Sequence, residues 1–136
     1  MVERKRHPHD FFNREEKERI LKAIRSAEKD TSGEICFHLD RRADGYVMDR
    51  AKIVFQRHGL HRRKHRNAVL IYVLLTNRSF AILGDEGIHR HVGDDFWKRI
   101  VESLQHDFSR GEFLPGLEHA INEVGKKLKD HCPLST

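Results

Sequence analysis

The sequence has few cysteines and no long apolar run. Cys36 and Cys132 are the only two cysteines in 136 residues, and no C-x-x-C pair occurs. A disulfide framework is therefore not expected, and free thiols in a reducing compartment are the simplest interpretation. The longest apolar stretch, Ala68 to Leu75, is far shorter than the roughly 20 residues of a membrane-spanning helix. No apolar signal segment follows the basic start of the chain, so we expect a cytoplasmic protein without a membrane anchor.

Motifs of familiar enzyme classes are also missing. The chain contains neither a G-x-x-x-x-G-K-[ST] phosphate loop nor a G-x-S-x-G nucleophile elbow. Its eleven histidines do not follow the H-E-x-x-H spacing of a zinc protease. The sequence therefore favours a binding protein over an enzyme.

Charged and apolar residues are both abundant. Charged residues make up 35% of the chain and hydrophobic residues 38%, and the formal net charge is +5. The apolar residues fall in periodic blocks, which is typical of a folded body with a solvated surface. The positive charge permits attraction to nucleic acid, anionic membranes or acidic proteins without selecting among them.

Apolar residues at helical spacing predict several amphipathic helices. Asn13 and Glu16 have the spacing of a capping box, and Ile20, Leu21 and Ile24 then recur on one face. The loop 84–93 is expected to separate the last two helices from the preceding strand. The expected helices cover about 14–27 or 14–29, 47–58, 94–108 and 117–128.

Three segments are predicted to be strands. Residues 34–40 alternate between apolar and polar side chains, which indicates one buried face. Residues 68–75 form an unbroken apolar run, as expected of a central strand covered on both faces. The polar turn 76–79 leads into the short apolar run 80–83, and together they predict a hairpin.

The order of these elements predicts an α/β fold. We expect a single-domain sandwich whose small mixed sheet combines a parallel crossover with a hairpin and is flanked by helices on both faces. Residues 1–10 lack periodicity and are expected to form a flexible lead-in. The domain itself is assigned to residues 11–130, followed by a tail at 131–136.

Several short motifs occur in an order known from one protein family. They are Asn67 before Val69-Leu70-Ile71, Arg78 in the turn, Gly84 and Gly87 after the hairpin, and Phe108-Ser109-Arg110-Gly111 followed by Gly116. With the order of elements, they make residues 11–130 resemble the TPM domain. The resemblance implies a compact α/β sandwich. For activity it implies acid phosphatase activity or calcium binding, as in some members, or the assembly or repair of membrane complexes, as in others.

The chain departs from the commoner TPM pattern in two respects. Many members carry an export signal and a membrane-spanning tail, and neither is found in these 136 residues. The glycine-aromatic-glycine turn of the family is replaced by Gly84-Asp85-Glu86-Gly87, so two carboxylates stand in place of an aromatic residue.

Acidic residues and histidines gather after the hairpin, where they predict a cation site. Carboxylates without thiolates favour Ca²⁺ or Mg²⁺, whereas participation of His89 would favour Mn²⁺ or Zn²⁺. The alternative is a solvated loop followed by an acidic helix cap. The candidate ligands are Asp85, Glu86, His89, Asp94 and Asp95.

The segment 57–66 carries five permanent cations and three histidines in ten residues. Such density attracts anions, so an acidic protein or an anionic surface is the expected partner. No aromatic residue is interleaved to stack on bases, which disfavours sequence-specific nucleic-acid binding. The alternative is a solvated loop. The candidate anion-binding residues are Arg57, Arg62, Arg63, Lys64 and Arg66, with Arg78 of the hairpin turn.

Three functional hypotheses follow from these two segments. The leading one is a non-catalytic module that binds a cation or a partner through the loops after the strands, around residues 84–95. The second is a weak metal-dependent phosphohydrolase that uses Asp85 and Asp94. The third is an anion-binding adaptor that uses residues 57–66.

Overall fold

The computed structural model describes residues 11–134. The predicted lead-in 1–10 and residues 135–136 of the predicted tail lie outside the described residues. The elements along the chain are helix α1 (Arg14–Glu28), strand β1 (Glu34–Asp40), helix α2 (Val47–Arg57), the 3-10 turn η1 (Leu60–Arg62), strands β2 (Ala68–Leu74) and β3 (Ser79–Gly84), and helices α3 (Glu86–Val92), α4 (Asp94–Ser109) and α5 (Phe113–His131).

The strands form one mixed sheet in the order β1-β2-β3. β1 runs parallel to β2, and their register extends from Glu34 opposite Ala68 to Asp40 opposite Leu74. β2 and β3 are antiparallel neighbours joined by the short turn. The predicted combination of a parallel crossover, which contains α2, with a hairpin is therefore confirmed.

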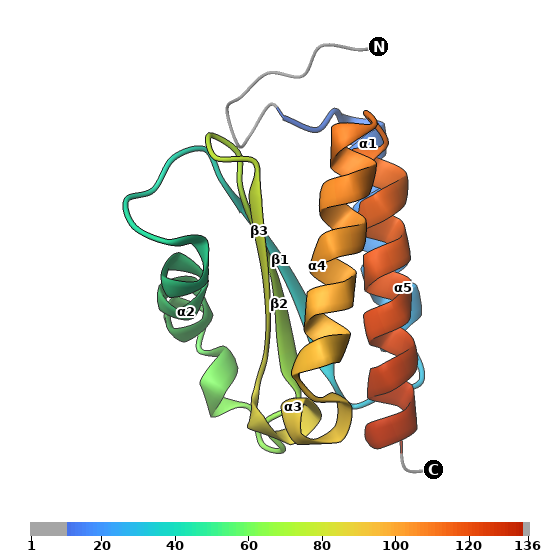
Figure 1. Cartoon of the computed structure of the whole chain (residues 1–136). Coiled ribbons are helices and arrows are strands. Elements are labelled where there is room, and N and C mark those ends of the chain that lie inside the picture. Colours follow the sequence, from blue (N-terminus) through green and yellow to red (C-terminus); the bar gives the residue numbers. More distant parts are fainter. Residues whose placement is uncertain (1–10, 135–136) are drawn as a thin grey trace.

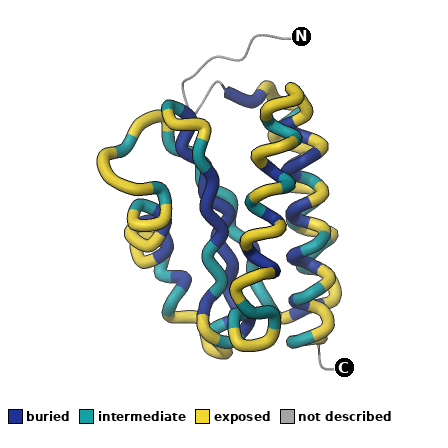
Figure 2. Tube along the Cα trace, viewed as in Figure 1, coloured by how far each residue is buried: buried dark blue, intermediate teal, exposed yellow. Residues whose placement is uncertain are grey.

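Helices cover both faces of this sheet, as predicted. α2 lies on one face, and α1, α4 and α5 lie on the other (Figure 1). Every residue of the central strand β2 is fully buried, and Figure 2 shows mostly dark strands between the two layers of helices. Val69, Ile71 and Val73 belong to the larger core beneath α4 and α5, whereas Leu70 and Tyr72 belong to the core beneath α2.

Helix α1 begins with the predicted capping box. The Glu16 backbone N–H donates to Asn13 Oδ1 at 2.8 Å, and the Asn13 backbone N–H donates to Glu16 Oε1 at 3.1 Å. These two bonds satisfy donors that the helix itself leaves free.

Two helix assignments from the sequence need correction. The interval 84–93, expected as a loop, contains α3, which the sequence pattern misses because only Ile88 among its seven residues is buried. α5 begins at Phe113, four residues before the expected start. Pro115 lies in its first turn, where a missing N–H costs no hydrogen bond.

The two cysteines are free thiols, as the sequence interpretation expected. Cys36 and Cys132 are free and half-buried. Burial raises the pKa of the Cys36 thiol above its ordinary value, which makes the thiol a poor nucleophile. Within residues 11–134, no helix is both long enough and apolar enough to cross a membrane.

Candidate functional site

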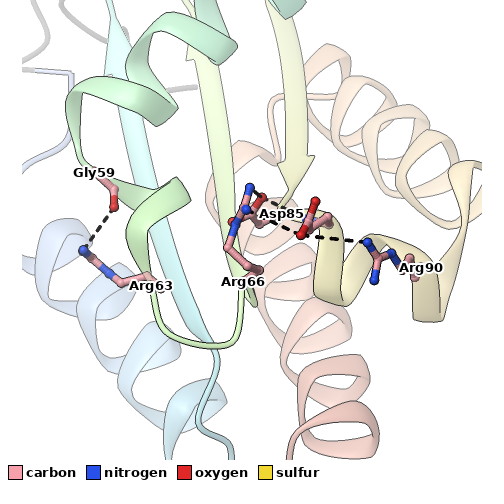
Figure 3. Close-up of polar contacts among 6 residues, drawn as sticks. Gly59, Arg63, Arg66, Asp85 and Arg90 are labelled. Atoms are coloured by element: carbon pink, nitrogen blue, oxygen red, sulfur yellow. Dashed lines mark hydrogen bonds and ion pairs between the residues drawn. The ribbon is translucent and has the colours of Figure 1, made fainter.

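The basic segment 57–66 and the acidic segment 84–87 meet at one end of the sheet. β2 begins at Ala68 and its antiparallel neighbour β3 ends at Gly84, so the residues flanking these two points are adjacent. Figure 3 shows the side chain of Arg66 turned toward Asp85. The two segments that the sequence offers as separate sites therefore form one surface.

A bidentate ion pair joins the two segments. Arg66 Nε donates to Asp85 Oδ2 at 2.6 Å, and Arg66 Nη2 donates to Asp85 Oδ1 at 2.9 Å. Arg66 Nη1 also lies 3.5 Å from Glu86 Oε1. The hydrogen bond to Asp85 raises the pKa of Arg66 further above its ordinary value. A carboxylate that is only 7% exposed needs such a partner, because burying an unpaired charge is costly.

Backbone contacts fix the same junction. The Asp85 N–H donates to the Ala68 carbonyl at 2.8 Å, and the Gly87 N–H donates to the Arg66 carbonyl at 2.9 Å. Asp85 Oδ1 also accepts the Glu86 N–H at 2.9 Å and caps α3. Arg66 itself adopts a left-handed backbone, with φ at 58°, which turns the chain into β2. The junction is thus held by both side chains and main chain.

The five predicted metal ligands divide between two places. Asp85 and Glu86 face Arg66, whereas His89 Nε2 lies 3.4 Å from Asp94 Oδ1. Asp95 is exposed in the first turn of α4, which agrees with the alternative interpretation as an acidic helix start. In the described part of the chain, no three His, Cys, Asp or Glu side chains are arranged to hold a metal ion.

His89 has little freedom to act as a ligand. Trp97 Nε1 donates to His89 Nδ1 at 3.0 Å, which leaves the ring proton on Nε2, next to Asp94. Both ring nitrogens therefore already have partners. A metal ion at His89 would have to displace one of them.

The predicted anion-binding residues fall into three groups. Two of them are paired with carboxylates: Arg66 with Asp85, and Arg63 with Glu34 through Nε and Nη2. Arg63 Nη1 also donates to the Gly59 carbonyl at 3.2 Å. Arg78 lies apart, in the β2–β3 turn at the opposite end of the sheet (Figure 1). The remaining members are exposed and form no ion pair with the residues described in the structure: Arg57, Arg62 and Lys64.

A cavity of about 240 Å³ opens beside the ion pair. It lies between α2 and the end of β3, and its polar lining includes Lys52, His61 and Arg66. His61 Nδ1 is buried and finds no hydrogen-bond partner among residues 11–134. Such an orphaned polar atom marks a position where a ligand atom or a water can bind. The cavity thus adds to the surface one cation that lies outside the basic segment, Lys52, and places the His61 imidazole of that segment beside it.

A second polar network lies between β1 and the end of α2. Tyr72 donates its hydroxyl to Asp40 Oδ2 at 2.7 Å, and His38 Nε2 lies 2.9 Å from Asp40 Oδ1. His38 Nδ1 in turn lies 3.1 Å from His58 Nε2. Burial is the main reason why the pKa of Tyr72 rises to about 12, and the bond to Asp40 adds to it. The network ties the basic segment to β1 through His58.

The TPM domain family matches residues 6–127, which is most of the chain. The chain belongs to the TPM domain family. This TPM domain resembles the NMR structure of the BA42 protein from the psychrophilic bacterium Bizionia argentinensis at 40% sequence identity. That match covers 93% of this chain and 88% of BA42, with a TM-score of 0.85.

A second solved structure shares the fold alone. It is the N-terminal domain of a protein from P. gingivalis, which is 17% identical in sequence and has a TM-score of 0.70. The match covers 92% of this chain and 83% of that one. No curated protein matches the chain.

One catalytic motif that the spacing allows is excluded by the fold of this TPM domain. Cys36 and Arg42 have the Cys-x5-Arg spacing of cysteine-dependent phosphatases. The residues from Cys36 to Asp40 belong to β1, however, and an extended strand rises about 3.3 Å per residue. Cys36 and Arg42 therefore cannot surround one phosphate group.

The sequence alone gives only part of the network around Asp40. Alternation places His38 and Asp40 on the same face of the first strand, and the parallel register then sets Tyr72 opposite His38. No local pattern brings His58 to His38, because the two are 20 residues apart and meet only when α2 packs on the sheet.

Tyr72 is expected to lose its phenolic proton at a higher pH than an ordinary tyrosine. Because its folded pKa of about 12 lies above the ordinary 10, the protonated phenol stabilises the fold below pH 10, and this contribution is lost as the pH rises toward 12. The ultraviolet absorbance of phenolate, compared between the wild type and Tyr72→Phe, isolates this one group. If the absorbance difference develops fully around pH 10, the inferred pKa is wrong.

Proposed function

We propose that this TPM domain is a non-catalytic binding module that holds an anionic partner on its basic surface. The basic surface consists of Arg57, Arg62 and Lys64 together with Lys52 and His61 of the adjoining cavity. The observation that carries the proposal is that some cations of the segment are paired with carboxylates and others are not. Arg63 and Arg66 are occupied by carboxylates, whereas the three exposed cations have no acidic partner in residues 11–134.

The ion pairs explain how the basic surface is positioned. Arg63 with Glu34 and Arg66 with Asp85 fix the two sides of the last turn before β2. Neighbouring cations that are held in place add their fields, so an anion gains attraction without having to order a flexible loop first. Because these charges are exposed, the attraction should weaken as salt is added.

A divalent cation at residues 84–95 is a second proposal. Asp94 and Asp95 keep their carboxylates in solvent, which favours weak binding of Ca²⁺ or Mg²⁺ there. Asp85, by contrast, would have to leave Arg66. Metal-dependent hydrolysis of a phosphate ester requires such an ion, so it depends on this second proposal.

Removal of the three exposed cations tests the first proposal. Arg57→Gln, Arg62→Gln and Lys64→Gln in one chain should weaken binding to heparin, used as a generic polyanion, by at least about tenfold at low salt. The matched control is Lys22→Gln, Arg25→Gln and Lys29→Gln, which removes the same charge from exposed positions on and just after α1. Equal losses in both triple variants would show that net charge alone attracts the polyanion.

Amide NMR spectra of the same samples separate the two proposals. Heparin should shift resonances of residues 57–66, and the shifts should be smaller in the first triple variant. Titration with Ca²⁺ and Mg²⁺ provides the other arm. Chemical-shift changes confined to residues 84–95 would support the cation site. Unchanged amide shifts in these residues would contradict it.

A further inference from the structure

The hydrogen-bond pattern of the sheet shows which groups of β3 face outward. The Asp85 N–H bonds to the Ala68 carbonyl directly opposite, so these two residues form a hydrogen-bonded pair. Such pairs alternate along an antiparallel ladder. Ala81 and Leu83 therefore bond to β2, whereas the N–H and C=O groups of Phe80, Ile82 and Gly84 point to the free edge of the sheet. These outward groups have no partner in the described chain.

An apolar groove follows this free edge between α2 and α4. One cavity, of about 290 Å³, is lined by residues that include Met48, Phe80 and Trp97. A second, of about 190 Å³, continues past Ile82 to Gly84 and shares Met48 and Trp97 with the first. Met48 is 39% exposed and forms part of the rim on the α2 side. Polar side chains also line it, namely Lys98 in both cavities, Glu102 in the first, and His89 and Asp94 in the second. The groove thus combines unpaired backbone groups with walls that are partly apolar.

The end of the groove next to Gly84 is cationic. The cavity of the basic surface shares Leu83 and Gly84 with the groove, and its lining includes Lys52 and His61. Asp85 at this end is already paired with Arg66. A ligand that follows the groove therefore passes from apolar side chains toward the ammonium group of Lys52, which forms no ion pair among residues 11–134.

The other edge of the sheet, formed by β1, differs from the β3 edge at its beginning. On β1, the groups that face outward belong to Ile35, Phe37 and Leu39, because Glu34 bonds inward to the Asn67 carbonyl. The Glu28 carboxylate accepts the Ile35 N–H at 2.8 Å and closes the beginning of that edge. One outward donor of β1 is therefore already bonded, whereas no side-chain bond to the outward groups of β3 is found among residues 11–134.

We propose that β3 binds an extended acidic peptide as a fourth strand. Only another extended chain can match donors and acceptors that recur at every second residue. Alternate side chains of the peptide lie against Met48 and Trp97, and its carboxylate end lies beside Lys52 and His61. The charge of that end selects an acidic partner, so this inference rests on the anion binding proposed above and specifies the partner.

Amide hydrogen exchange tests the added strand directly. The probe is a synthetic peptide of alternating valine and threonine that ends in Asp-Glu with a free C-terminus. Binding should slow exchange at the N–H groups of Phe80 and Ile82 by at least about tenfold, while Ala81 and Leu83, already paired with β2, change little. A peptide with proline at alternate positions cannot donate to the edge and should give no protection.

Peptide and protein variants test the two ends of the groove. Met48→Glu places a carboxylate on the apolar rim and should abolish peptide protection while heparin binding persists. Lys52→Gln should weaken the Asp-Glu peptide several-fold and leave an otherwise identical Asn-Gln amide peptide unaffected. An Asp-Glu peptide with an amidated C-terminus separates the side-chain carboxylates from the terminal one.

Each outcome bears on the proposal. Peptide shifts confined to residues 57–66, or no protection of Phe80 and Ile82 at any peptide concentration, would overturn the added strand and leave anion binding intact. If the two triple variants lose heparin binding equally while the peptide still protects Phe80 and Ile82, the proposed function is overturned instead. If Phe80 and Ile82 become protected with rising protein concentration and no peptide, the occupant is a second copy of the chain, which also overturns the proposal.

Discussion

Replacing Gly87 with alanine is expected to destabilise the fold and to displace the basic surface. The added methyl group would lie 2.4 Å from Asn67 Oδ1 and 2.7 Å from the carbonyl oxygens of Arg66 and His65. Main-chain atoms cannot move aside separately, so α3 must shift away from the start of β2. Overpacking of this kind costs about 1–3 kcal/mol or more in the free energy of unfolding. Urea denaturation followed by circular dichroism measures the loss.

The position of Gly87 makes this change a test of the junction as well. The shift should break the bond from the Gly87 N–H to the Arg66 carbonyl and loosen the pair between Arg66 and Asp85. Heparin binding should therefore fall together with stability. Gly45→Ala is a comparison for backbone strain alone, because Gly45 has φ at 93°, where alanine is strained, but no atom within 4 Å of the added methyl group. A Gly87→Ala variant as stable as the wild type would contradict the packing described for this junction.

Replacing Trp97 with alanine should have the largest effect on stability. The indole is 7% exposed and belongs to the larger core, and its ring packs so closely on Gly84 that a methyl group there would lie 2.4 Å from it. Truncation of a buried aromatic side chain to alanine costs about 3–5 kcal/mol. The midpoint of urea denaturation, followed by circular dichroism at constant slope, reports the change.

A phenylalanine at position 97 separates packing from hydrogen bonding. Trp97→Phe keeps an aromatic ring but removes the donor to His89 Nδ1, so it should cost clearly less than Trp97→Ala. Trp97 also forms the α4 wall of the groove on β3, and Trp97→Phe should therefore weaken the peptide without abolishing heparin binding. Equal losses of stability in the two variants would mean that the ring contributes little to the core.

The joining of the two charged segments changes how the TPM domain is interpreted. The sequence presents 84–95 and 57–66 as rival sites of opposite charge. In the fold, Arg66 neutralises Asp85, and the acidic residue serves to position the basic segment. The exposed cations Arg57, Arg62 and Lys64 remain unpaired in residues 11–134, which is why we propose that this end of the sheet binds an anion.

The sequence by itself determined the architecture of this protein. The apolar run of β2 and the alternation in β1 follow from burial on two faces and on one, and the capping box of α1 follows from four consecutive residues. Patterns of this kind are local, because the periodicity of a helix or strand dictates which side chains can be buried. The mixed sheet between two layers of helices was predicted correctly for this reason.

Only the tertiary structure decided which polar groups meet. The pair between Arg66 and Asp85 spans 19 residues and depends on the register of the hairpin. The contact between His38 and His58 depends on how α2 packs on the sheet. α3 is too short to carry a helical period, and the groove on β3 is built by two helices on opposite faces. Such contacts have no local signature, because packing brings together residues that the sequence leaves independent.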